Sequence, residues 1–260
     1  MKHMSRWSRQ QPSAAGEGDI AVRLREVTKR YGKGPHAVLA LDHLSADITR
    51  GTFTAVMGPS GSGKSTFLHC AAGLDRPTSG SVRLGSTELS QLKETPLARL
   101  RRARMGFVFQ AFNLLPSLTV LQNITLPLRL QGRRADGEWL GEIVARMDLS
   151  ERLSHVPAEL SGGQQQRVAI ARALVTRPEV VFADEPTGSL DPETARDILG
   201  LLRQAVTDLQ QTVVMVTHDP VAAAHADSAV FLAQGRIVTA LASPTADRVA
   251  ATMAGLRKAA

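Results

Sequence analysis

The sequence predicts an α/β domain built on a mainly parallel core sheet. Short apolar runs alternate along the chain with stretches of helical periodicity, which is the pattern that strand–helix–strand units produce. Four runs contain almost no polar residue and are typical of central strands covered on both faces, at 52–57, 106–109, 180–183 and 212–216. With 260 residues, 43% of them hydrophobic, the chain can bury a sizeable core.

Changes in composition divide the chain into segments. Residues 1–18 are polar, lack the apolar stretch of a secretory signal and predict a disordered lead-in to a main domain over residues 19–242. Residues 88–157 are rich in Leu, Arg and Glu at helical spacing, which predicts a mainly helical lobe inserted into the sheet domain. A late hairpin is expected at 228–238, and the Ala- and Arg-rich tail, 243–260, predicts a short surface helix.

Composition also narrows the class of protein. A single cysteine, Cys70, excludes an intramolecular disulfide and indicates a reducing compartment. No apolar run approaches the ~18 residues of a membrane span, so we expect a cytoplasmic protein that docks, if at all, on a membrane protein. The net charge of +7 would suit an anionic partner, but 4% aromatic residues and no nucleic-acid motif favour an ordinary basic surface over nucleic-acid binding.

The first chemical motif is GPSGSGKST, which fits the pattern G-x-x-x-x-G-K-[ST] between an apolar strand and a helical pattern. It comprises Gly58, Pro59, Ser60, Gly61, Ser62, Gly63, Lys64, Ser65 and Thr66. The glycines let backbone N–H groups surround phosphates, Lys64 neutralises the charge of the β- and γ-phosphates, and the Ser65 hydroxyl ligates Mg²⁺. A glycine-rich turn without a ligand explains neither Lys64 nor Ser65, so we predict a phosphate-binding site.

Polar side chains follow three of the predicted strands. In VVFADEP, Asp184 is placed to hold Mg²⁺ and Glu185 to accept a proton from an attacking water. A solvated turn is the alternative for this pair, but the nearby phosphate-binding loop favours catalysis. His218, in MVTHD, is expected to contact the γ-phosphate from the same sheet edge, although a lone histidine is more often structural. Gln110, after GFVF, is the third polar residue, and a capping role is its alternative.

A second Ser-Gly-Gly turn runs into a helix at LSGGQQQRVAIARAL, residues 160–174. Backbone N–H groups at the start of a helix attract anions, and glycines let the anion approach closely. The chain therefore carries two turns suited to phosphate, far apart in the sequence, and nothing local explains why one domain needs both.

Taken together and in this order, the motifs resemble those of the nucleotide-binding subunit of an ABC transporter. LSGGQ, residues 160–164, is the signature motif of that family, and the resemblance covers residues 20–240. It implies a P-loop NTPase fold of the ABC type, with an antiparallel β subdomain and a helical subdomain that carries the signature. It also implies a head-to-tail dimer with a second copy of the chain, in which the signature turn of one subunit closes on ATP held by the other. The two turns would then serve one site.

The resemblance assigns further roles residue by residue. Five residues would act in trans on the ATP of the partner: Ser161, Gly162, Gly163, Gln164 and Asp191. Asp191 also has a local role, because Asp-Pro is a good start for a helix. Tyr31 would lie against the adenine ring, although an aromatic packed on the core explains it nearly as well. Gln110 would ligate Mg²⁺ and sense water, Glu185 would be the general base, and His218 would be the γ-phosphate switch.

Residues 97–128, LARLRRARMGFVFQAFNLLPSLTVLQNITLPL, are similar to the branch of the family that serves lipoprotein release and macrolide export. This implies a separate integral membrane permease, with residues 110–128 forming part of the groove for its cytoplasmic helix, although many of their apolar side chains could equally be core. The arginines of RLRRAR are interpreted as the solvated face of a helix.

The branch implies export or extraction of lipoprotein, antimicrobial peptide or hydrophobic drug, from a position on the inner face of the cell membrane. One alternative is a membrane-associated signalling ATPase of the cell-division type, which moves no substrate. Another is a nucleic-acid or translation ATPase, which the single phosphate-binding loop, the lack of a heptad run and the single cysteine disfavour.

Overall fold

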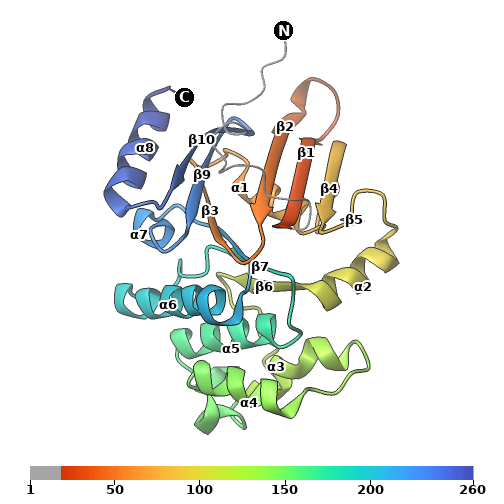
Figure 1. The fold of residues 1–260 in the computed structure, drawn as a ribbon, viewed down its shortest axis with the longest axis vertical. Coiled ribbons are helices and arrows are strands. Elements are labelled where there is room, and N and C mark those ends of the chain that lie inside the picture. Colours follow the sequence, from red (N-terminus) through yellow and green to blue (C-terminus); the bar gives the residue numbers. More distant parts are fainter. Residues whose placement is uncertain (1–18, 260) are drawn as a thin grey trace.

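The computed structural model describes residues 19–259. Two β-sheets and the helices around them form the fold, and Figure 1 shows the six-stranded sheet in the middle of the molecule. The disordered lead-in expected at residues 1–18 lies outside the described residues.

The six-stranded sheet is mainly parallel, as the apolar runs predict. Its strand order is β10-β9-β3-β8-β7-β6. Within this sheet of the described chain, β9 and β10 pair antiparallel, and the other neighbouring strands pair in parallel. The strands are β3 (Phe53–Met57), β6 (Met105–Phe109), β7 (Val180–Asp184), β8 (Val213–Val216), β9 (Ser228–Ala233) and β10 (Arg236–Ala242). The predicted late hairpin is confirmed, because β9 and β10 pair directly and turn at Gln234 and Gly235, both at positive φ.

A smaller antiparallel sheet covers one face of the six-stranded sheet, with strand order β2-β1-β4-β5. Its strands are β1 (Ile20–Tyr31), β2 (Val38–Thr49), β4 (Ser79–Leu84) and β5 (Thr87–Glu88). Helix α1 (Lys64–Ala71) lies between the two sheets, and its side chains Phe67 and Leu68 are buried in the core that both sheets share. The phosphate-binding loop therefore leads into a helix that is fixed on both sides.

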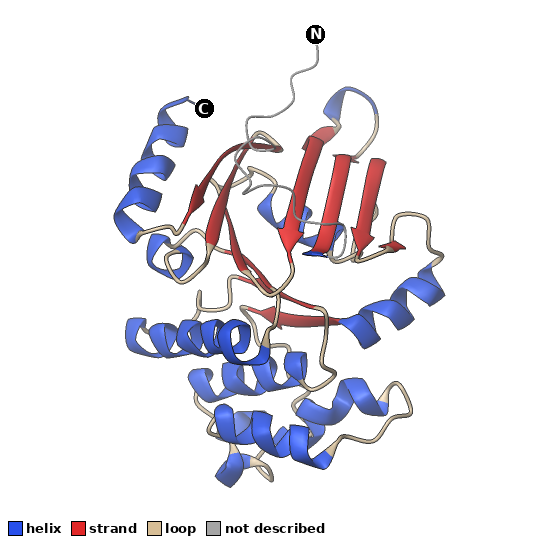
Figure 2. Cartoon of the chain, viewed as in Figure 1, coloured by secondary structure: helices blue, strands red, loops and turns tan. Residues whose placement is uncertain are grey.

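The remaining helices lie mostly on the other face and at one end, where Figure 2 shows them gathered away from the strands. The helices are α2 (Glu94–Arg104), α3 (Val120–Arg129), α4 (Gly137–Arg146), α5 (Gly162–Leu174), α6 (Pro192–Leu209), α7 (Pro220–Ala223) and α8 (Ala246–Ala259), with short 3-10 turns η3 (Gly34–His36), η4 (Ser150–Arg152) and η5 (Pro157–Glu159). None of the helices within residues 19–259 has the length and apolar character needed to cross a membrane.

Alternate residues of the central strands enter two different cores. On β3, Phe53 and Met57 pack into the core shared with α5, α6 and α8, whereas Val56 packs into the core around α1. On β7, Val181 and Phe182 divide between the two cores in the same way. Both faces of these strands are buried, which explains why their sequences are apolar runs and do not alternate with polar residues.

Strand β6 departs from the predicted central position, because it is an edge strand that pairs with β7 alone among the described strands. Its Phe107 and Phe109 are half-buried. The Phe107 ring stacks on Phe109 and on Phe182, with ring centroids 6.0 and 5.9 Å apart. The β6 sequence is apolar because of this ring packing and because the outer side of the strand faces a cavity. An apolar run alone therefore did not distinguish an edge strand from a central strand.

Two of the arginines expected on a solvated helix face are engaged instead. Arg101 donates to the carbonyl oxygen of Gly73 at 2.5 Å and pairs with Glu94 at 2.8 Å. Arg104 pairs with Glu179, just before β7, and donates to Thr87 at 2.8 Å. The bonds of Arg104 attach α2 to both sheets, and the bond from Arg101 to Gly73 attaches it to the turn after α1. The helical periodicity of the segment did not reveal these contacts.

The packing of α5 against β6 depends on the absence of a side chain at Gly106. A Cβ there would lie 2.5 Å from the carbonyl oxygen of Ala173, which is backbone and cannot yield locally. Gly106→Ala is therefore expected to lower the free energy of unfolding by about 1–3 kcal/mol, because it forces α5 away from the sheet.

The matched control is Gly200→Ala within α6, where an added Cβ meets nothing within 4 Å. It is expected to stabilise the protein by roughly 0.5–1 kcal/mol through helix propensity. Urea unfolding followed by circular dichroism measures both variants, and equal stability of the two would contradict this account of the α5–β6 contact.

Candidate functional site

The phosphate-binding loop joins the end of β3 to the start of α1. Gly58 and Gly63 have φ values of +151° and +102°, in the region that favours glycine. Neither has room for a side chain, since a Cβ would lie 2.3 Å from the Leu232 carbonyl oxygen and 2.4 Å from that of Ala40, respectively. One side of the loop is thus packed on neighbouring backbone, whereas Gly61 at its tip is exposed.

Lys64 is the first residue of α1, and its ammonium group folds back over the loop. The Nζ atom donates to the carbonyl oxygens of Gly58 and Pro59, each at 3.0 Å. The N-cap residue of α1 is Gly63, which has no side chain to cap the first N–H groups of the helix. The buried Ser62 Oγ has no hydrogen-bond partner among the described residues. A cation, an uncapped helix start and an unpartnered hydroxyl therefore converge on one loop, which fits a bound phosphate chain.

Two carboxylates face this cation from the end of β7. Burial is the main reason why the pKa of Asp184 is raised, with Glu185 acting in the same direction and with His69 and Lys64 opposing it. Burial likewise lowers the pKa of Lys64, and the charges of Glu185 and Asp184 oppose that change. The loop and the strand end therefore form one electrostatically coupled site.

Glu185 and His218 meet across the ends of adjacent strands β7 and β8. The Glu185 N–H donates to the Val216 carbonyl oxygen at 2.9 Å, and Glu185 itself adopts a left-handed φ of +45°. Its Oε1 lies 3.1 Å from Nδ1 of His218, whose side chain is 67% exposed. The structure thus brings together these two sequence-predicted residues and leaves the imidazole open to an approaching ligand.

Gln110 leaves the end of β6 and contacts the segment that follows Glu185. Ser189 Oγ donates to the Gln110 carbonyl oxygen at 3.1 Å, and a Cβ at Gly188 would lie 2.9 Å from Gln110 Nε2. Within residues 19–259, no hydrogen bond joins the Gln110 side chain to Lys64 or to either carboxylate. The structure therefore places Gln110 against the loop at Gly188 and does not bond it to the catalytic candidates.

The Ser-Gly-Gly turn forms the first turn of α5. Ser161 Oγ accepts from the Gln164 N–H at 3.2 Å, and Gln164 Oε1 accepts from the Ser161 N–H at 3.0 Å, which makes a reciprocal cap. A Cβ at Gly163 would lie 2.5 Å from Thr194 Cγ2, and one at Gly162 would lie 3.4 Å from Leu190 Cδ2. No hydrogen bond or ion pair in the described part of the chain joins this turn to the phosphate-binding loop.

Asp191 caps α6, as the Asp-Pro sequence predicts. Its Oδ1 accepts from the N–H groups of Glu193 and Thr194, at 3.1 and 3.0 Å, with Pro192 as the next residue. The bond with Thr194 is the main reason why the pKa of Asp191 is lowered. The local role is confirmed, and it leaves the opposite side of the exposed Asp191 available.

Tyr31 ends β1 beside the helix that follows the phosphate-binding loop. Its side chain is 41% exposed, which leaves part of the ring open to a ligand while the rest is covered by the protein. The hydroxyl donates to Asp75 Oδ2 at 2.7 Å, and Lys29 Nζ lies 4.8 Å from the ring centroid while bonding Asp75 Oδ1 at 2.6 Å. Burial is the main reason why the pKa of Tyr31 is raised, and a hydrogen bond with Thr66, near the start of α1, opposes that change.

Gln166 is a residue of the site that the motifs did not single out. It is fully buried in α5, and its Nε2 donates to the carbonyl oxygens of Phe109, at 3.3 Å, and of Pro186. It therefore links the residues that precede Gln110 and follow Glu185. The available signal was a polar residue on the buried side of an otherwise apolar helix pattern.

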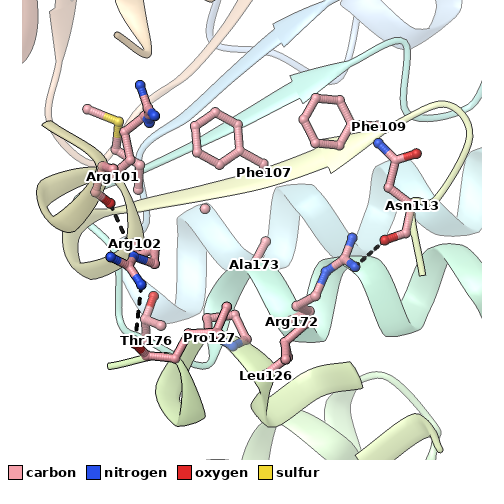
Figure 3. Close-up of a pocket in the computed structure, with 14 residues that line it drawn as sticks. Arg101, Arg102, Phe107, Phe109, Asn113, Leu126, Pro127, Arg172, Ala173 and Thr176 are labelled. Carbon is pink, nitrogen blue, oxygen red and sulfur yellow. Dashed lines mark hydrogen bonds between the residues drawn. The ribbon is translucent and has the colours of Figure 1, made fainter. Parts of the chain in front are cut away.

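A cavity of about 470 Å³ lies beside the site, between β6, α2, α3 and α5 (Figure 3). Its apolar lining includes Phe107, Phe109, Leu126, Pro127 and Leu130, and arginines 101, 102 and 172 contribute the charged part. Asn113, Leu126 and Pro127 come from the segment predicted to form a groove, residues 110–128. The adjoining edge of β6 and the exposed end of α3 make this an apolar, positively charged recess.

Because burial raises the pKa of Asp184, its ionised form destabilises the ligand-free chain at neutral pH. Asp184→Asn is therefore expected to raise the melting temperature at pH 7. The gain shrinks as the pH falls through the raised pKa, because the wild-type carboxyl then becomes neutral as well.

Asp191→Asn is the control of opposite sign, since the pKa of Asp191 is lowered and its ionised form stabilises the fold. Thermal unfolding of both variants without nucleotide, at pH 7 and pH 4, tests the pair. A melting temperature at pH 7 that is lower for Asp184→Asn than for wild type would contradict the assigned effect of burial.

The chain is similar to known proteins over the region that contains these motifs. Residues 41–188 match the family model described as ABC transporter. The macrolide export ATP-binding/permease protein MacB of Burkholderia pseudomallei (strain 1710b) is 45% identical over 228 residues, 87% of this chain, and the chain spans 35% of the length of that relative. The lipoprotein-releasing system ATP-binding protein LolD of Chromohalobacter salexigens is 42% identical over 226 residues, 86% of this chain and 95% of LolD.

Solved structures agree with this assignment. The dimeric structure of the ATP-binding cassette MJ0796 in a post-hydrolysis state, bound to ADP and Pi, superposes with a TM-score of 0.77 and 41% identity, covering 85% of this chain and 98% of the other. The MJ0796 sequence is that of Methanocaldococcus jannaschii. The predicted ABC-type fold is therefore confirmed, and the chain belongs to the ABC transporter family, of which it is an ATP-binding ATPase domain.

Proposed function

We propose that two copies of the chain hydrolyse ATP at composite sites and power a separate membrane permease. The observation that carries this proposal is the coupled cluster at one sheet edge, in which Lys64 faces Asp184 and Glu185, and Glu185 lies 3.1 Å from His218. An anion-binding loop, a carboxylate for metal and a carboxylate base are the parts that phosphoryl transfer to water requires.

The phosphates of ATP bind the loop from Gly58 to Thr66, and Lys64 exchanges the Gly58 and Pro59 carbonyl oxygens for phosphate oxygens. Ser65, Asp184 and Gln110 supply the oxygen ligands that Mg²⁺ prefers. No group of three or more His, Cys, Asp or Glu residues in the described chain is placed to hold a metal alone, which fits an ion shared with the phosphates. Bound Mg²⁺ neutralises the charge that develops on the phosphates.

Glu185 acts as the general base, taking a proton from the attacking water. The contact at 3.1 Å with His218 Nδ1 restrains the carboxylate. The exposed imidazole reaches the γ-phosphate through its other ring nitrogen, Nε2. The left-handed conformation at Glu185 supports this role, because such strained positions are concentrated at functional sites.

Tyr31 binds the adenine ring by stacking. Its ring is held from one side by Lys29 and through its hydroxyl by Asp75, and part of its side chain stays exposed. Because Thr66 lies beside the ring, a base stacked there is connected to phosphates in the loop without crossing the fold.

The second chain completes each site. Ser161, Gly162, Gly163 and Gln164 carry exposed or half-exposed groups at the start of α5, and Asp191 is exposed at the start of α6. Within residues 19–259 these residues are not bonded to the phosphate-binding loop, and two solved structures of MJ0796 are dimeric, one of them bound to ADP and Pi. A head-to-tail pair lets the signature turn of one chain close on the γ-phosphate held by the other, so that hydrolysis depends on closure.

The permease docks a cytoplasmic helix in the cavity beside β6. Its apolar walls at Phe107, Phe109 and Leu126 suit the apolar face of a helix, and the arginines that line it suit acidic side chains. A relative named as a macrolide export ATP-binding/permease protein and one named as the ATP-binding protein of a lipoprotein-releasing system support a membrane permease as the partner. The chain would then work on the cytoplasmic face of the membrane.

Export or extraction from the bilayer is the coupled process we favour. The named relatives serve macrolide export, bacitracin export and lipoprotein release. These names favour transport over the signalling alternative, in which the same ATP-driven closure would act on a membrane partner without moving a substrate.

Glu185→Gln is expected to bind ATP normally but to hydrolyse it roughly 100-fold more slowly than wild type, or slower still. The reason is that an amide cannot accept the proton of water. ATP then accumulates in the closed dimer, which size-exclusion chromatography with ATP and Mg²⁺ detects. The control is Lys64→Ala in the Glu185→Gln background, which lacks the loop cation and stays monomeric. Near-normal turnover by Glu185→Gln would remove Glu185 from the base role.

Leu126→Glu in the cavity is expected to abolish permease binding, because it puts a charge where an apolar helix face packs. Val238→Glu is the control, since Val238 is an exposed apolar residue on β10 at the opposite edge of the sheet. Tagged proteins, both in the Glu185→Gln background, are used to recover partners from detergent-solubilised native membranes with ATP. Recovery of a permease with Val238→Glu but not with Leu126→Glu supports the docking site, and equal recovery contradicts it.

A further inference from the structure

The loop that connects β6 to α3 contains two consecutive residues in an unfavourable conformation. Phe112 and Asn113 have φ values of +58° and +51°, and neither is glycine. Left-handed backbone at such residues persists only where surrounding groups hold it in place. Gln110 lies two residues before this turn, so whatever holds the turn also constrains the course of the chain at Gln110.

Arg172, near the end of α5, holds both of these residues. Its guanidinium donates from Nη2 to the Phe112 carbonyl oxygen at 2.8 Å and from Nη1 to that of Asn113 at 2.5 Å. Figure 3 shows the Arg172 side chain rising from the helix toward Asn113. The planar fork of arginine can bridge two adjacent carbonyl groups in a way that the single ammonium of lysine cannot reproduce.

The two carbonyl oxygens are the groups that stabilise the charge of Arg172. The Arg172 side chain is half-buried, burial lowers its pKa, and no carboxylate among residues 19–259 forms an ion pair with it. A partly desolvated cation without a counter-ion is unfavourable, and the two carbonyl dipoles stabilise it. Arg172 and Asn113 both line the cavity beside β6, so the clamp borders that recess.

The same helix holds the start of the loop. Gln166, six residues before Arg172, donates to the carbonyl oxygen of Phe109, the last residue of β6. Helix α5 therefore grips the loop at Phe109 and again at Phe112 and Asn113, with Gln110 between the two attachments. The helix begins at Gly162 and is capped by Ser161, so its first turn consists of residues proposed to act on the ATP of the partner chain.

We propose that Arg172 is a positioning residue that fixes Gln110 for ATP hydrolysis by clamping the left-handed turn at Phe112 and Asn113 to α5. The proposal rests on the proposed function of Gln110 at the Mg²⁺ and water site. A displacement of α5, or an occupant of the cavity, changes the clamp and thereby the placement of Gln110. Arg172 acts through the loop, because its guanidinium bonds the carbonyl oxygens of Phe112 and Asn113.

A double-mutant cycle tests this inference in the full chain. Arg172→Met is expected to lower kcat by about tenfold to a hundredfold, the scale on which displacement of a reacting group by an ångström acts, with an unchanged Kd for ATP. Arg172→Lys is expected to behave like Arg172→Met, because the charge alone does not bridge both carbonyl groups. In a Gln110→Ala background, Arg172→Met should lower kcat no further, since its effect passes through Gln110.

Arg167→Met is the matched control on the same helix. Arg167 also donates to a backbone carbonyl oxygen, that of Met147 at 3.2 Å, but within residues 19–259 it makes no hydrogen bond to the 109–113 loop. It is expected to leave kcat unchanged even if it lowers the melting temperature. Hydrogen exchange of residues 110–114 should be faster in Arg172→Lys than in wild type, which keeps a readout available if Arg172→Met folds poorly.

The outcomes separate the two claims. Normal turnover by Gln110→Ala would overturn the proposed role of Gln110, and the clamp with it. If Gln110→Ala is impaired, an additive effect of Arg172→Met, or unchanged kcat and loop exchange in Arg172→Lys, would overturn the inference about Arg172 alone. Loss of the Arg172 effect in the Gln110→Ala background, with faster loop exchange, supports the clamp.

Discussion

The whole site depends on the register of one parallel sheet. Phe109 aligns with Asp184, and Asp184 aligns with Val216, so the residues that follow β6, β7 and β8 emerge side by side. Val56 of β3 pairs with Val216 in the same ladder, which brings the phosphate-binding loop to that edge. Because a slip of one residue would reverse the faces of a strand, the buried cores on both sides hold this alignment.

The alignment concentrates charge in a partly buried place. Burial lowers the pKa of Lys64 and raises that of Asp184, so it favours the neutral form of both groups. Their charged forms are therefore unfavourable at this edge when no ligand is bound. A polyanion with its cation would relieve both, so nucleotide binding and fold stability are linked. Helix α5 extends this link, since its first turn, its buried Gln166 and its Arg172 contact three parts of the same edge.

Much of this arrangement is predictable from the sequence, because it depends on local patterns. Apolar runs predicted the strands, and the polar residues after these runs, among them Gln110, Glu185 and His218, were predicted to lie at one edge of the sheet. The edge position of β6 and the clamp by Arg172 were not predictable. Both depend on which segments pack together, and an arginine in a helix has the same pattern whether it faces solvent or two backbone carbonyl groups.

The central claim is that each ATP site is built from two chains, and a mixing experiment tests it directly. Lys64→Ala disables the phosphate-binding loop, and Ser161→Glu places a negative charge in the signature turn. Neither variant alone should hydrolyse ATP. A mixture contains heterodimers in which one site joins the intact loop of one chain to the intact signature turn of the other, so ATP turnover by the mixture is the predicted result. A mixture as inactive as its components would contradict the composite site.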